Sequence, residues 1–117
     1  EAEGNRKPSY VHYHQTTFGV AGNGLLDWAL KLGHANATIH LLKIDIETAE
    51  AYVFEELFRG NRCNLDIVHL NLENHWNAVS EQMDAEKKLV ELCHMEKFAQ
   101  ELATGILYEH GYVKVNW

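Results

Sequence analysis

The chain has 117 residues, which suits one domain, and 17 acidic against 10 basic side chains give it a formal net charge of −7 at pH 7. This acidic balance, with no basic block, disfavours nonspecific binding to nucleic acid or to anionic lipid. Hydrophobic residues make up 46% of the chain, an ordinary globular proportion, and no apolar run is long enough to span a membrane. The composition therefore predicts a globular protein with no nucleic-acid partner and no membrane partner.

The chain has two cysteines, Cys63 and Cys93, and neither lies in a CxxC motif. One bridge is possible, but the pattern favours two free buried thiols and leaves the redox compartment undecided. Asn36-Ala37-Thr38 is a formal N-glycosylation acceptor that matters only in a secreted protein.

The first part of the chain predicts a flexible lead-in, a strand and a short helix. Residues 1–9 are polar and contain Pro8, the only proline. Residues 10–18 are rich in aromatic and β-branched side chains and predict a strand. After a glycine-rich turn, residues 25–32 place apolar side chains on one helical face, and Gly33 follows as a stop.

The central part predicts a strand–helix–strand unit. Residues 39–44 are almost continuously apolar, as in a strand covered on both faces. Residues 49–58 have helical periodicity, and residues 65–72 predict a second strand. Such units almost always have parallel strands, so we expect these two strands to be parallel.

The last part predicts a long helical region over residues 80–110, as one helix or as two helices broken near His94. Gly111 would end it, and residues 112–117 alternate like a final strand at the edge of the sheet. The whole pattern predicts a single α/β domain over residues 10–117.

Ionisable side chains follow both strands of the central unit. Asp45, Glu47 and Glu50 follow the first strand, and Glu73 and His75 follow the second. The carboxyl ends of parallel strands meet at one edge of a sheet, where α/β proteins bind ligands. Crowded carboxylates there raise one another's pKa or recruit a cation. The alternative is that these are simply polar residues where strands meet solvent.

Residues 42–50, LKIDIETAE, resemble the LKIDIEGAE signature of FkbM-type methyltransferases at eight of nine positions. The departure is Thr48, where the family usually has glycine. Leu72-Glu73-Asn74-His75 is similar to the Ile-Glu-Ile-His-like end of the family's next strand.

This resemblance implies a class I, S-adenosylmethionine-dependent O-methyltransferase fold. Its Rossmann-like sheet would be mostly parallel, with an antiparallel C-terminal edge strand, and its acceptor would be a hydroxyl of a small molecule or a glycan. Asp45 would lie near the transferred methyl group, Glu47 and Glu50 would shape the pocket, and Glu73 and His75 would close it. His75 or Asp45 would accept the hydroxyl proton.

The chain resembles only the carboxyl-terminal portion of such a domain. Only nine residues precede residue 10, and the three glycines at positions 19, 22 and 24 lack GxGxxG spacing. The cofactor-binding half is therefore expected to be missing. Its absence would leave the isolated chain inactive unless that half is supplied in trans.

Two other functions remain open. A non-catalytic interaction module would pair through an open sheet edge, for example as a homo-oligomer. A small metal-binding domain would use His12 and His14 for zinc, or Asp45, Glu47 and Glu73 for magnesium or calcium.

Overall fold

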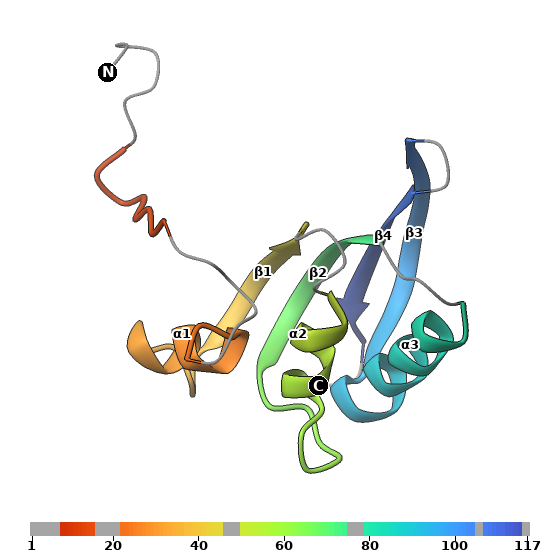
Figure 1. The fold of residues 1–117 in the computed structure, drawn as a ribbon, viewed down its shortest axis with the longest axis horizontal. Coiled ribbons are helices and arrows are strands. Elements are labelled where there is room, and N and C mark those ends of the chain that lie inside the picture. The colour runs from red at the N-terminus through yellow and green to blue at the C-terminus, as the bar shows by residue number, and fades with distance from the viewer. Residues whose placement is uncertain (1–7, 16–21, 46–49, 75–78, 105–106, 116–117) are drawn as a thin grey trace.

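The structure, a computed structural model, describes residues 8–15, 22–45, 50–74, 79–104 and 107–115. Its elements, in chain order, are α1 (Leu25–Lys31), β1 (Thr38–Ile44), α2 (Glu50–Leu57), β2 (Asp66–Asn74), α3 (Val79–Cys93), β3 (Met95–Thr104) and β4 (Leu107–Lys114). The four strands form one sheet in the order β1-β2-β4-β3 (Figure 1). The predicted α/β class is confirmed.

The sheet is mixed. β1 and β2 are parallel, whereas β4 is antiparallel to both of its neighbours. The expectation of a mostly parallel sheet is therefore wrong for the described strands. The reason is that β3 and β4 are joined by a short connection, which allows only antiparallel pairing, whereas a parallel pair needs a crossover such as α2.

The short helix α1 agrees with the prediction at both ends. At its start, the carboxylate of Asp27 accepts a hydrogen bond of 2.9 Å from the backbone N–H of Gly24. At its end, Gly33 has a φ of 75°, and the N–H of His34 donates to the carbonyl of Ala29 at 2.7 Å. This is the left-handed helix ending for which glycine is preferred.

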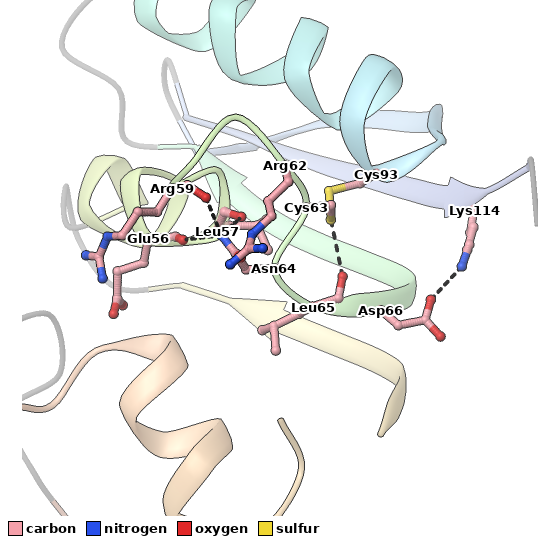
Figure 2. Close-up of a disulfide and its surroundings, with 10 residues drawn as sticks. All are labelled: Glu56, Leu57, Arg59, Arg62, Cys63, Asn64, Leu65, Asp66, Cys93 and Lys114. Atoms are coloured by element: carbon pink, nitrogen blue, oxygen red, sulfur yellow. Dashed lines mark hydrogen bonds and ion pairs between the residues drawn. A yellow bond between two sulfur atoms is a disulfide. The ribbon is translucent and has the colours of Figure 1, made fainter. Parts of the chain in front are cut away.

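The predicted strand–helix–strand unit is confirmed as β1, α2 and β2. The last carbonyls of α2 have no partner within the helix and need donors from elsewhere. The side-chain amide of Asn64 is one such donor, because it donates to the carbonyls of Glu56 and Leu57 at 3.2 and 3.0 Å, and to that of Arg59 just beyond the helix at 2.8 Å (Figure 2). One side chain in the loop therefore holds the end of α2 in place before β2 begins.

The long helix predicted over residues 80–110 is correct only as far as Cys93. His94 has a φ of 57°, which ends α3, and the chain continues as the hairpin β3–β4. The sequence of β3, MEKFAQELAT, consists mostly of good helix formers. Pairing with β4 overrides that preference.

The final strand is also placed differently from the prediction. β4 lies between β2 and β3, so the edge strands of the described sheet are β1 and β3. Gly111, expected to end a helix, lies inside β4 and pairs with Asn71 and Ala99. The expected strand over residues 10–18 is absent from its described part, residues 10–15, where Tyr10 and Tyr13 are exposed. Residues 16–18 lie outside the described residues.

The core lies between the three helices and one face of the sheet. Along β2, the buried side chains of Leu70 and Leu72 alternate with the exposed ones of His69 and Asn71. The buried face packs with residues of all three helices in a single cluster, and Figure 1 shows α2 and α3 in front of the strands. The helical members of the cluster are Leu25, Ala29, Val53, Phe54, Leu57, Ala85, Leu89 and Cys93.

The opposite face of the sheet is not covered by any described helix. Leu41 of β1 and Phe98 of β3 are 62% and 60% exposed. His69 lies between these strands on the same face, and its ring meets the Phe98 ring edge-on at 6.3 Å between centroids.

The two cysteines are joined by a disulfide, with their Cα atoms 5.1 Å apart. The prediction of two free thiols is therefore wrong. Cys63 lies in the α2–β2 loop and Cys93 at the end of α3, so residues 30 positions apart come together only when α3 packs beside that loop (Figure 2).

Candidate functional site

The carboxyl ends of β1 and β2 lie at the same edge of the sheet. The two strands are in register, with Lys43 opposite Asn71 and Ile44 opposite Leu72. Asp45 directly follows Ile44, and Glu73 directly follows Leu72. The structure therefore places the two acidic strand ends next to each other, as the sequence predicts.

Asp45 and Glu73 differ in their surroundings. Asp45 is exposed just beyond the end of β1, whereas Glu73 is partly buried within β2. Of the other predicted site residues, Glu50 begins α2, but its side chain lies outside the description. Glu47 and His75 lie outside the described residues.

A shallow depression of about 270 Å³ lies beside Glu73. A cation, an amide and a carboxylate gather in it, supplied by Lys43, Asn71 and Glu73. Phe98 forms part of its wall, close to Gly111, where a Cβ atom would come within 2.9 Å of the Phe98 ring. A Cβ atom at residue 111 would therefore displace the ring from its present position.

His110 also lines this depression and belongs to a buried polar network. Its Nδ1 lies 3.2 Å from the hydroxyl of Tyr112, which donates a 3.0 Å hydrogen bond to Glu86 of α3. Lys97 of β3 donates to the same carboxylate oxygen at 2.7 Å. The network joins α3 to both strands of the hairpin.

The environment sets the charge of each member. Burial opposes ionisation of Glu86, but hydrogen bonds from Lys97, Gln82 and Tyr112 outweigh it and lower its pKa. Burial, reinforced by the charge of Lys97, lowers the pKa of His110, against the opposing effect of Glu86. Burial also raises the pKa of the Tyr112 hydroxyl, as does Glu86. At neutral pH the network therefore holds a carboxylate, a neutral imidazole and a neutral phenol.

This network is not predicted from the sequence, because the pattern around Lys97 and His110 indicates a helical region and not a hairpin that packs against Glu86. The available signal was the run from Gly111 to Lys114, which alternates as a strand and could have been extended backwards through His110.

The chemistry of the depression suits a neutral molecule with hydroxyl groups. Lys43 and Asn71 carry N–H donors, and the carboxylate of Glu73 is a hydrogen-bond acceptor. The exposed ring of Phe98 supplies an apolar surface beside them. This arrangement can bind and orient a polar ligand.

Within the described ranges, no group of three His, Cys, Asp or Glu residues has the geometry of a metal site. His14 lies in the irregular segment before α1, with its ring 4.9 Å from that of Trp28. The magnesium or calcium set proposed from the sequence includes Glu47 and so reaches outside the described residues. None of the helices described is long and apolar enough to cross a membrane.

Comparison with known family models, with curated proteins and with solved structures finds no match to this chain.

Proposed function

We propose that this chain is an S-adenosylmethionine-dependent O-methyltransferase-like domain of the FkbM type that acts on a hydroxyl group. The observation that carries the proposal is the in-register parallel pairing of β1 with β2. It pairs the beginning of the LKIDIETAE segment, residues 42–44, with residues 70–72, so Asp45 and Glu73 follow at the same edge of the sheet, as a shared site requires. The last strand of the chain, β4, is antiparallel to its neighbours, as the resemblance implies, but it lies inside the sheet and not at its edge.

The proposed site residues are those of the acidic edge. Asp45 would lie near the transferred methyl group, and Glu47 and Glu50 would shape the pocket from the loop and from the first turn of α2. Glu73 and His75 would close the pocket from the neighbouring strand. The substrate hydroxyl would lose its proton to Asp45 or His75, and alignment of the reactants would supply much of the acceleration.

The described residues fit the acceptor side of this site better than the cofactor side. Ahead of β1, residues 8–15 are irregular, and residues 22–37 consist of a turn, α1 and the loop that follows it. They contain no strand followed by a glycine-rich turn. Full cofactor binding is therefore proposed to depend on further sequence, either upstream of residue 1 or on a second chain.

Calorimetric titration with S-adenosylmethionine and with its demethylated product tests the proposal. We expect heat of binding from the chain extended by its upstream coding sequence, and weaker or no heat from residues 1–117 alone. Asp45→Asn should reduce methyl transfer by the extended protein. Asp84→Asn is the matched control, because Asp84 lies on α3 and pairs with Lys88 at 3.2 Å. An extended protein that binds neither molecule would rule the function out.

A non-catalytic interaction module is the second candidate, favoured by the uncovered face of the sheet. Leu41 and Phe98 expose large apolar side chains on this face, and β1 and β3 are the edges of the described sheet. Under this hypothesis, sedimentation velocity should show an oligomer that Leu41→Lys dissociates. Met83→Lys, on the exposed surface of α3, should leave the oligomer intact. A monomer at all concentrations would exclude self-association through this face.

A further inference from the structure

Asn36-Ala37-Thr38 is the only Asn-x-Ser/Thr triplet in the chain, and neither proposed function uses it. Its first two residues lie in the turn between α1 and β1, and Thr38 is the first residue of β1. All three residues are exposed. The asparagine therefore has the surface position that a bulky, solvated glycan needs.

The disulfide is an independent observation that points to the same processing environment. A bond between Cys63 and Cys93 forms and persists in oxidising compartments, such as the secretory pathway, and is rare where thiols are kept reduced. Asn36 lines the same open depression of about 430 Å³ as both cysteines, so the two features lie on one side of the molecule. Attachment of N-linked glycans belongs to proteins that are secreted.

We propose that Asn36 is an N-glycosylation site in a chain that matures in an oxidising secretory compartment. The donor would be an oligosaccharide linked through pyrophosphate to a lipid. A bond forms between Nδ2 of Asn36 and the anomeric carbon, while the bond from that carbon to the pyrophosphate oxygen breaks. The lipid pyrophosphate leaves with the bonding electron pair, and the amide nitrogen loses one proton.

The position of Thr38 indicates when this transfer takes place. In the folded chain its hydroxyl donates a 2.8 Å hydrogen bond to Asp66 at the start of β2. The hydroxyl of the acceptor triplet is therefore engaged once β1 pairs with β2. Transfer to Asn36 comes before this pairing, and the exposed turn then accommodates the attached glycan.

The experiment directs the full chain into the secretory pathway of cultured animal cells with a cleavable signal and follows its mobility with and without peptide N-glycosidase. Wild type should show a glycosidase-sensitive shift, with Asn36 converted to Asp after cleavage as detected by mass spectrometry. Asn36→Gln and Thr38→Ala should abolish the shift. Thr38→Ser should retain it, because serine preserves both the acceptor triplet and the hydroxyl that donates to Asp66.

The thiols are measured on the same samples. After denaturation without reductant, Cys63 and Cys93 should resist alkylation, and both should react after reduction. Wild-type chain that is secreted with its disulfide but without a glycan would overturn the proposal, as would a shift that persists in Asn36→Gln. Reactive thiols in secreted, folded chain would also overturn it, because the disulfide carries the assignment to an oxidising compartment. None of these results depends on methyl transfer, so the proposal and the proposed function fail independently.

Discussion

A carboxylate oxygen of Glu56 on α2 accepts a 2.7 Å hydrogen bond from the backbone N–H of Leu25, the first residue of α1. Glu56 is only 3% exposed, so this contact is a buried charge held against the start of a helix. The partial positive charge of a helix N-terminus stabilises such an anion, and the N–H of Leu25 has no partner within α1. Residues 31 positions apart are thereby joined, and α1 is anchored to the central unit.

Glu56→Ala should destabilise the protein by about 1.5–3 kcal/mol, because it leaves the N–H of Leu25 without its charged acceptor. Glu56→Gln should cost less, since its amide oxygen still accepts the bond without the charge. Urea denaturation measures both effects. Glu55→Ala is the control, because its side chain lies exposed on the same helix. Equal stabilities for Glu56→Ala and Glu55→Ala would show that the contact contributes nothing.

Breaking the disulfide should lower the free energy of unfolding by about 3–4 kcal/mol, the loop-closure entropy expected for a closed loop of this size. The comparison is made by urea denaturation of wild type with and without reductant. The double variant Cys63→Ala, Cys93→Ala should match reduced wild type and be insensitive to reductant. Oxidised and reduced wild type of the same stability would contradict the prediction.

Acidification should destabilise the protein through His110. The pKa of this histidine is lowered from 6.5 in the folded state, so the unfolded chain binds more protons below about pH 6.5. Its contribution to stability is present above that pH and is lost as the pH falls through the folded pKa. The facing charged groups are Glu86 on α3 and Lys97 on β3.

His110→Gln should therefore flatten the dependence of the unfolding free energy on pH between pH 7 and pH 5. The difference of one bound proton changes that free energy by at most about 1.4 kcal/mol per pH unit. His34→Gln, at an exposed histidine in the loop after α1, is the control and should retain the wild-type slope. At lower pH, the stability that Glu86 contributes through its lowered pKa should be lost in wild type and in the His34 control. If the unfolding free energy of His110→Gln depends on pH as steeply as that of wild type, His110 is not the group responsible.

Local sequence patterns are enough to predict the central unit and the end of α1. The apolar run before Asp45, the helical period of α2 and the second apolar run are local patterns, and local patterns specify parallel strands joined by a helix. The meeting of Asp45 with Glu73 follows from that unit alone. The end of α1 is also local, because the positive φ of Gly33 depends only on the residue being glycine.

Long-range contacts determine the last third of the chain, the disulfide and the polar network. The helix-forming residues of β3 become a strand because β4 pairs with them, and the helix breaks at His94. Cys63 meets Cys93, and Glu86 meets His110, through contacts between segments far apart in the sequence. Local propensities are worth a fraction of a kilocalorie per residue, whereas strand pairing and core burial act over whole elements and therefore decide where the two disagree.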